Sequence, residues 1–179
     1  MKRNQLLDEI SIVRAVARMT HEIIERNRGV EDICLMGVKS RGVPLAERIN
    51  ANIEKFEGVK VPIGYLDVTR HRDDMTIEEK EIRATECYFP CEMRDKTVII
   101  VDDVLYTGRT ARAAMECVFA HTRPKALQLA VLIDRGHREV PIRPDYVGKN
   151  VHTSRHEDIA VLLGDADGQN AVYISDETK

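Results

Sequence analysis

The sequence predicts an α/β fold in which a central, mostly parallel sheet is flanked by helices. Two observations lead to this prediction. Short apolar, β-branched runs alternate along the chain with segments of helical period, which is typical of consecutive βα units. In addition, a chain of 179 residues that is 43% apolar can bury the core of one domain, so we expect a single domain over residues 1–179.

The first elements follow from apolar spacing and from stop signals. Apolar side chains recur on one helical face over 8–28, and Gly29 follows as a C-terminal stop, so a helix is predicted there. The residues of this face are Val13, Val16, Met19, Ile23 and Ile24. The apolar run 33–38 predicts a strand, and Pro44 suits the first turn of a helix that continues to about 53.

The second half of the chain continues the same alternation. An apolar strand is predicted at 61–66, and the charged stretch 67–86 after it is too long for an ordinary connection, as is typical of a lid over a site. The run 97–101 is typical of a strand buried on both faces of a parallel sheet. The remaining predicted elements are a helix at 109–121, a strand at 126–133, a loop-rich stretch through Asn150, and short strands at 159–163 and 171–175.

Charge and hydropathy exclude several classes of protein. The net charge of -3 gives no general attraction to nucleic acid, so any such binding must come from a local patch. The sequence has no apolar run near 18 residues and no charged-then-apolar leader, so we expect a cytoplasmic protein that does not bind membranes.

The four cysteines are expected to be free thiols. They occupy a strand-like run, a loop and a helix-like run, without the paired short spacings of a zinc site. Cys87 and Cys91 could form half of such a site, but no second Cys or His pair has matching spacing. The other two are Cys34 and Cys117.

The segment VIIVDDVLYTGRT, at 98–110, carries the strongest chemical signal. Ligands bind at the carboxyl ends of strands in open α/β sheets, so Asp102 and Asp103 are expected where a ligand would lie. The helix N-terminus that follows offers unpaired N–H groups and a positive dipole end, which together with the hydroxyls of Thr107 and Thr110 can hold a phosphate. Gly108 allows the backbone to approach closely.

Two carboxylates beside a phosphate site are expected to bind a part of the ligand other than the phosphate. They would repel a bare phosphate, but each can accept hydrogen bonds from the vicinal hydroxyls of a ribose. The spacing therefore predicts a ribose 5-phosphate site. The alternative is a plain helix N-cap by Asp103 or Thr107, which explains one acid and one threonine but not the whole segment.

The same segment resembles the phosphoribosyl diphosphate signature of type I phosphoribosyltransferases. A second segment, LIDRGHREVPIRPDYVGKN at 132–150, resembles one branch, the bifunctional PyrR proteins, which regulate pyrimidine operons by binding messenger RNA and have uracil phosphoribosyltransferase activity. The similarity runs from about 8 to 173, and only about 75–94 fits poorly. It implies the type I fold, with a small hood and a flexible lid loop over about 67–90.

The resemblance implies a binding role for each part of the first motif. Asp102 and Asp103 would hold the ribose hydroxyls of 5-phosphoribosyl 1-diphosphate and take part in catalysis by steadying the positive charge on the ribose. The residues implied to bind the ribose 5-phosphate beside them are Val104, Leu105, Tyr106, Thr107, Gly108, Arg109 and Thr110.

Two further loops resemble family motifs. The loop 37–42 resembles the diphosphate loop, usually written with Thr at Ser40, and implies diphosphate binding by Lys39, Ser40 and Arg41, the last also catalytic. An ordinary strand-to-helix turn is the alternative. The stretch 67–74 resembles the start of the flexible catalytic loop, so Arg72 would close over the diphosphate, although a solvated charge cluster would look similar.

The implied reaction is attack of uracil N1 on the ribose C1 carbon, which gives UMP and diphosphate. The resemblance implies Mg²⁺ carried mainly by the diphosphate, with no direct protein ligand, and mainly electrostatic catalysis. It also implies a uracil pocket at Ile133, Asp134, Arg135 and Gly136.

A basic surface could bind RNA. Five Lys or Arg and two acids lie between Arg135 and Arg155, and the predicted helix at 8–28 carries further basic groups on its polar face. The residues expected to bind a messenger RNA leader hairpin, and so promote transcription attenuation in response to UMP or UTP, are Arg14, Arg18, His21, Arg26, His137, Arg138, Arg143 and Lys149. A solvated basic face is the alternative. Ala17 stands where relatives often have Thr, so one hydroxyl contact is missing.

Two other functions remain open at this point. The chain could be a regulator with little catalysis, or a type I phosphoribosyltransferase for another base, such as a purine, with no RNA-binding role. The resemblance also implies a homodimer or a higher homo-oligomer.

Overall fold

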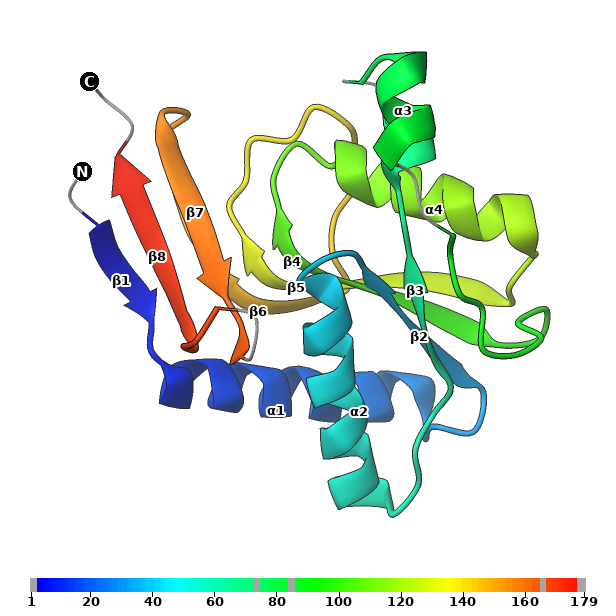
Figure 1. Cartoon of the computed structure of the whole chain (residues 1–179). Helices are drawn as coiled ribbons and strands as arrows, with labels where there is room; N and C mark the ends of the chain where they lie inside the picture. The colour runs from blue at the N-terminus through cyan, green and yellow to red at the C-terminus, as the bar shows by residue number, and fades with distance from the viewer. Residues whose placement is uncertain (1–2, 73–74, 84–85, 165–166, 177–179) are drawn as a thin grey trace.

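Five parallel strands form the central sheet of the computed structural model, which describes residues 3–72, 75–83, 86–164 and 167–176 (Figure 1). Their order across the sheet is β3-β2-β4-β5-β6. The strands are β2 (Ile33–Val38), β3 (Ile63–Leu66), β4 (Thr97–Leu105), β5 (Ala126–Asp134) and β6 (Tyr146–Asn150). This arrangement confirms the predicted α/β class.

Side-chain alternation along the central strands divides the core between the two faces of the sheet. Ile33 and Leu35 of β2 pack on one face with residues of α1 (Glu9–Asn27) and α2 (Gly42–Glu57), whereas Cys34 and Met36 pack on the other with α4 (Arg109–His121). Figure 1 shows α1 and α2 on one side of the sheet and α4 on the opposite side. Both faces are buried, as the apolar runs predicted.

The first helix has clear end signals, and its apolar face is the predicted one at Val16, Met19 and Ile23 but not at Val13. The Asp8 carboxylate caps α1 by accepting from the amide of Ser11 at 2.8 Å, and Arg28 closes the helix in the left-handed conformation. The face turned to the core includes Ile12, whereas Val13 is 57% exposed. Both residues are apolar, so spacing alone left the phase of the helix about one position uncertain.

A small antiparallel sheet stands at one end of the central sheet, where both termini lie (Figure 1). It contains β1 (Arg3–Leu7), β8 (Ala171–Asp176) and β7 (Glu157–Leu162), in the order β1-β8-β7. We call it the hood. Its strands β7 and β8 match the short strands predicted there, but β1 was not predicted.

The segment between β3 and β4 has more regular structure than its charge predicted. A 3-10 turn, η1 (Thr69–His71), and a short helix, α3 (Ile77–Arg83), lie within the predicted lid, which we call the lid segment (67–90). Asp73 and Asp74, part of the motif identified in the sequence, fall outside the described residues. The backbone of Tyr88 pairs with Tyr65 of β3, which attaches the far end of the lid segment to the sheet.

Two strands differ in extent from the prediction. β4 continues through Asp102 and Asp103 to Leu105, because pairing with β5 uses backbone groups and is indifferent to side-chain charge. β6 occupies the end of a stretch that was predicted to be a loop. Within the described part of the chain, no helix combines the length and the apolar character that crossing a membrane requires.

Candidate functional site

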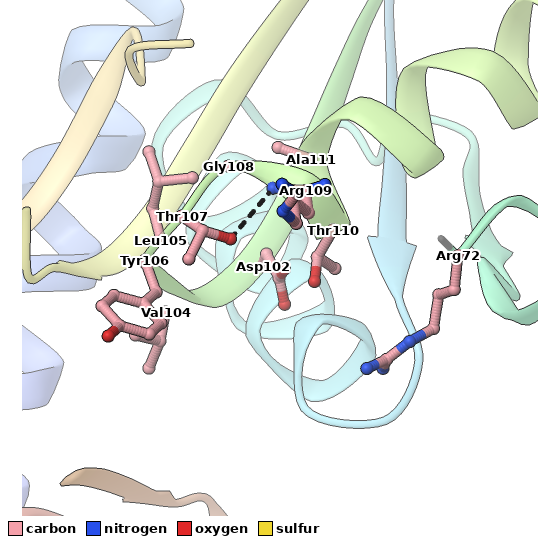
Figure 2. Close-up of a pocket in the computed structure, with 10 residues that line it drawn as sticks. All are labelled: Arg72, Asp102, Val104, Leu105, Tyr106, Thr107, Gly108, Arg109, Thr110 and Ala111. Atoms are coloured by element: carbon pink, nitrogen blue, oxygen red, sulfur yellow. Dashed lines mark hydrogen bonds between the residues drawn. The ribbon is translucent and has the colours of Figure 1, made fainter. Parts of the chain in front are cut away.

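The turn between β4 and α4 forms the floor of a cavity of about 320 Å³ (Figure 2). Asp102 and Arg72 line it on either side of the helix N-terminus. The other residues that line it are Val104, Leu105, Tyr106, Thr107, Gly108, Arg109, Thr110 and Ala111. The structure therefore brings together nearly the whole segment predicted to bind a ribose 5-phosphate.

Glycine is required at the helix N-terminus for two reasons. Gly108 is the N-cap of α4 with φ 89°, a left-handed conformation that side chains disfavour. A Cβ atom at this position would lie 2.7 Å from Cγ2 of Val140. Thr107 Oγ1 accepts from the amide of Arg109 at 3.3 Å, and this contact closes the turn. The result is a helix N-terminus at the floor of the cavity, which is a place where an anion can bind.

Asp102 is the buried acid of the site. Its Oδ1 accepts from the amide of Asp103 at 2.9 Å, and its side chain is directed into the cavity in Figure 2. Burial, and then the negative charge of Asp103, raise the pKa of Asp102 well above its usual value. A ligand that donates hydrogen bonds to this carboxylate would relieve the cost of holding the charge.

Asp103 has a different environment. Its Oδ1 accepts from the amide of Val104 at 2.9 Å, and its half-buried side chain is not among the described residues that line the cavity. Both acids lie within β4, where successive side chains generally alternate between the two faces, but the two carboxyl groups are close enough for Asp103 to affect Asp102. A contact of Asp103 with ribose stays a prediction.

The second predicted loop packs against the first through glycines. A Cβ at Gly42 would lie 2.3 Å from the carbonyl oxygen of Val101, and one at Gly37 would lie 2.6 Å from Cα of Val43. Backbone can therefore meet backbone where the loop after β2 meets β4. The peptide between Lys39 and Ser40 is cis.

The two cations of this loop contact other parts of the fold. Arg41 Nη2 donates to Asp167 Oδ1 at 2.9 Å, and Arg41 Nε is buried with no hydrogen-bond partner. The amide of Leu163 and the Arg41 guanidinium lower the pKa of Asp167. Lys39 Nζ lies 4.4 Å from the centre of the Tyr65 ring. Arg41 is thus held at the hood with one donor unused, which suits an anion that has still to bind.

Arg135 and Arg138 hold the loop after β5, which was predicted to bind uracil. The Arg135 guanidinium lies 4.0 Å from the centre of the Tyr106 ring and donates to the carbonyl of Glu157 at 2.5 Å. Arg138 pairs with Asp134 at 2.6 Å and donates to the carbonyl of Tyr106 at 2.8 Å. Ile133 and Asp134 end β5, and Gly136 follows them in the next turn. These contacts fix the loop after β5 against the phosphate turn.

The residues predicted to bind RNA lie in two groups. Arg18 donates to the carbonyls of Val147 and Gly148 in β6, so the polar face of α1 adjoins β6. The members of this first group are Arg14, Arg18, Arg26 and Lys149, with Arg143 just before β6 and His21 stacked on Phe56. The second group is His137, which contacts the carbonyl of Thr153 at 2.6 Å, and Arg138. Arg138 is half-buried and uses its donors within the fold, whereas Arg14, Arg143 and Lys149 are exposed, so the first group is the better candidate surface.

Some residues of the site could not be identified from the sequence. Asp167 contacts Arg41 across 126 positions of the chain, and Val140 limits the space beside Gly108. Asp167 belongs to no motif, and Val140 lies in the 132–150 segment with no role assigned to it, so only tertiary contact reveals their part in the site. Ala111, which lines the cavity, follows the motif directly and could have been included with it.

Three comparisons with known proteins agree that the chain resembles phosphoribosyltransferases over nearly its whole length. The family model described as "Phosphoribosyl transferase domain" matches residues 2–162. The "Bifunctional protein PyrR" of Clostridioides difficile (strain 630) is 53% identical over 98% of this chain and 99% of that protein, and that of Acetivibrio thermocellus is 54% identical over 98% and 95%. A hypoxanthine-guanine phosphoribosyltransferase structure from Bacillus anthracis has a TM-score of 0.72 at 19% identity and covers 98% of this chain and 99% of that one. A likeness at this identity concerns the fold alone.

Proposed function

The chain belongs to the phosphoribosyltransferase family and, within it, to the bifunctional PyrR proteins, and on this basis we propose two functions for one pocket. The first is uracil phosphoribosyltransferase activity, which makes UMP and diphosphate from uracil and 5-phosphoribosyl 1-diphosphate. The second is regulation of pyrimidine biosynthesis genes, in which bound UMP or UTP promotes binding to a messenger RNA leader hairpin and transcription attenuation.

The β4-to-α4 turn is the observation that carries the proposal. Its N–H groups and the Thr107 and Thr110 hydroxyls suit the 5-phosphate, while the buried Asp102 carboxylate suits the ribose hydroxyls. Arg41, with its unused Nε, suits the diphosphate. One molecule that has all three groups is 5-phosphoribosyl 1-diphosphate.

Catalysis in this geometry would be mainly electrostatic. Uracil N1 attacks C1 of the ribose while the bond from C1 to the diphosphate oxygen breaks, and the N1 proton passes to the departing diphosphate or to water. Positive charge develops on the ribose and negative charge on the leaving group. The Asp102 carboxylate would steady the first charge, and Arg41 and Arg72 the second. The lid segment, which carries Arg72, would close and exclude water.

Magnesium would reach the site with its substrate. Among the described residues, no cluster of three or more His, Cys, Asp or Glu side chains could hold a metal ion. The diphosphate itself offers the oxygen ligands that Mg²⁺ prefers. The ion would neutralise charge on the departing diphosphate.

A direct assay tests the enzymatic proposal. Purified protein mixed with 5-phosphoribosyl 1-diphosphate, Mg²⁺ and one base at a time should release diphosphate with uracil, and not with hypoxanthine, guanine or adenine. Release with a purine alone would favour the alternative, a type I phosphoribosyltransferase for another base with no RNA-binding role. If none of the four bases leads to release of diphosphate, the enzymatic proposal is wrong.

The surface formed by the polar face of α1 and by β6 supports the RNA-binding proposal. Exposed Arg14 and Lys149 lie on the two elements, and Arg18 joins them. Aligned cations of this kind can neutralise successive RNA phosphates, which makes binding sensitive to salt.

Paired substitutions test this surface. Arg143→Ala with Lys149→Ala should weaken UMP-dependent binding to a leader hairpin, and should lower the slope of log K against log salt by roughly 0.7–0.9 for each phosphate that is no longer neutralised. Lys55→Ala with Arg123→Ala removes two exposed cations outside this surface and should leave both quantities unchanged. Equal RNA binding by the two double variants would exclude the proposed surface.

We also propose that the protein assembles as a homodimer or a higher homo-oligomer in the cytoplasm, where its nucleotide and RNA ligands occur. Ile10 and Val13 expose 62% and 57% of their surface on α1, and a second copy could cover them. Sedimentation velocity would show whether the monomer predominates.

A further inference from the structure

Four cysteines gather beside α4, none of which the proposed reaction uses. Cys34 and Cys117 are buried, and Cys87 and Cys91 are half-buried at the end of the lid segment. All four are free thiols. No described trio of His, Cys, Asp or Glu side chains is arranged for a metal ion, so a zinc site does not explain the cluster.

One pair is in direct contact. Sγ of Cys87 lies 3.0 Å from Sγ of Cys117, and the two residues are 30 positions apart in the chain. A disulfide bond length is ~2.05 Å, so the two sulfurs need to approach by only about 1 Å to bond.

The contact is fixed by the register of two elements. Along the same stretch, Phe89 stacks on His121 with ring centroids 3.6 Å apart. Two positions in an extended segment and four positions in a helix both span roughly 6–7 Å. Cys87 therefore lies opposite Cys117 when Phe89 lies opposite His121. The backbone pairing of Tyr88 with Tyr65 holds this segment from the other side. The two thiols are therefore held together by the fold.

The two sulfurs have different environments. Cys87 is half-buried, and its Sγ accepts from the amide of Asp67 at 3.3 Å and lies 3.6 Å from the carbonyl oxygen of the same residue. Burial, followed by the hydrogen bond with Cys87, raises the pKa of Cys117 to about 12. Cys87 is thus the group that an oxidant meets first, and Cys117 needs to reach only Cys87.

We propose that Cys87 and Cys117 are a redox-sensitive pair that a peroxide converts to a disulfide. The Cys87 thiolate attacks one oxygen of hydrogen peroxide, and the O–O bond breaks. Hydroxide leaves, and Cys87 becomes a sulfenic acid. The Cys117 sulfur then attacks the Cys87 sulfur, the S–O bond breaks, and the departing hydroxide takes the Cys117 proton. In total, two thiols and one peroxide give one disulfide and two waters.

The disulfide would link two parts of the site. Cys87 lies at the end of the lid segment and contacts Asp67 at its beginning, whereas Cys117 lies on the helix whose N-terminus forms the phosphate turn. Oxidation therefore ties the base of the lid segment to α4. The expected consequence, loss of most uracil-dependent turnover, rests on the proposed function, but formation of the disulfide does not.

The test begins with a peptide map of the full chain treated with hydrogen peroxide. Trypsin should give a cross-link between peptides 84–94 and 113–125 that disappears on reduction. Peptide 84–94 contains both Cys87 and Cys91, so Cys91→Ser is the matched control and should keep the cross-link, whereas Cys87→Ser should lose it. Cys117→Ala keeps the buried position apolar and should also lose it.

Each result is decisive. A cross-link that survives Cys87→Ser, a link from Cys34 to Cys87 that persists in Cys91→Ser, or sulfinic acid at Cys87 without a cross-link would overturn the proposal. A disulfide that forms and raises Tm by roughly 5–10 °C, as a closed loop of this length predicts, supports it. If the reduced protein turns over uracil and reductant does not restore this turnover after oxidation, the proposed effect of the disulfide on the lid segment is wrong, even where the disulfide forms.

Discussion

At the scale of single residues, the site holds a carboxylate that is largely buried and has few hydrogen-bond donors around it. Asp102 is buried in a strand, beside the negative charge of Asp103, and the fold provides one backbone donor to it. An ionised carboxylate in such a place lowers the stability of the free protein. The hydroxyls of a bound ribose would supply the missing donors, so the group that costs stability is also the one that favours the ligand.

Asp102→Asn should therefore stabilise the free protein and impair binding. Asn keeps the contact with the amide of Asp103 but carries no charge. The pKa of Asp102 is raised in the folded protein, so the folded state holds the proton more tightly than the unfolded state does. The burial of Asp102 therefore costs no stability at a pH below the ordinary pKa of 3.8, and stability is lost as the pH rises from there through the folded pKa. The gain from Asp102→Asn should be absent at low pH and largest at neutral pH.

Thermal unfolding followed against pH would check this prediction. Asp95→Asn, at an exposed aspartate, is the matched control and should show no such pH-dependent gain. Affinity for 5-phosphoribosyl 1-diphosphate should fall roughly 10- to 100-fold in Asp102→Asn, the usual effect of removing a charged hydrogen-bond acceptor. A variant that is less stable at every pH would contradict the account of Asp102.

At the scale of elements, the sequence predicted those parts that local chemistry determines. The central strands are apolar because both faces are covered, and the residues around the cavity are contiguous in one motif. β1 (RNQLL) was missed because a polar edge strand has no apolar pattern, and β6 was missed because Gly148 is typical of a loop. In the fold, a Cβ at Gly148 would lie 2.5 Å from the carbonyl of Leu132, so tertiary packing requires glycine there. Contacts such as Arg41 with Asp167 depend on that packing.

The N-terminus of α4 allows a matched test of the phosphate turn. Gly108→Ala and Gly58→Ala both place a side chain at positive φ, which costs roughly 1–2 kcal/mol in each case. A Cβ at Gly58 meets nothing within 4 Å, whereas one at Gly108 meets Val140. Both variants should lose stability in thermal melts, but only Gly108→Ala should weaken UMP binding, by at least about tenfold in calorimetry. Normal UMP binding by Gly108→Ala would show that the turn does not hold the phosphate.

At the scale of the whole molecule, three separate parts of the chain carry residues assigned to the ligand. The phosphate turn and Arg72 of the lid segment line the cavity, whereas Arg41, which Asp167 holds between β7 and β8, is not among the described residues that line it. Because these parts come from distant stretches of the chain, a ligand that contacts all of them should stabilise the fold as a unit.

UMP should therefore raise the melting temperature of the full chain. At a UMP concentration of about 100 Kd, binding contributes about 2.7 kcal/mol, which corresponds to roughly 5–10 °C for a protein of this size. Uridine lacks the phosphate and should give a much smaller shift at the same concentration. Equal shifts with UMP and uridine, measured by differential scanning fluorimetry, would show that the phosphate turn contributes nothing to binding.

The pairing of β1 with β8 also determines the order in which the protein can assemble on the ribosome. β1 is synthesised before the central sheet, but its partner β8 emerges only after all five strands of that sheet. During that interval the nascent chain can already form both anion-binding loops, while β1 remains without its sheet. A nucleotide present in the cell could thus meet a nascent pocket before the hood forms, and ligand supply could influence how well each new copy folds.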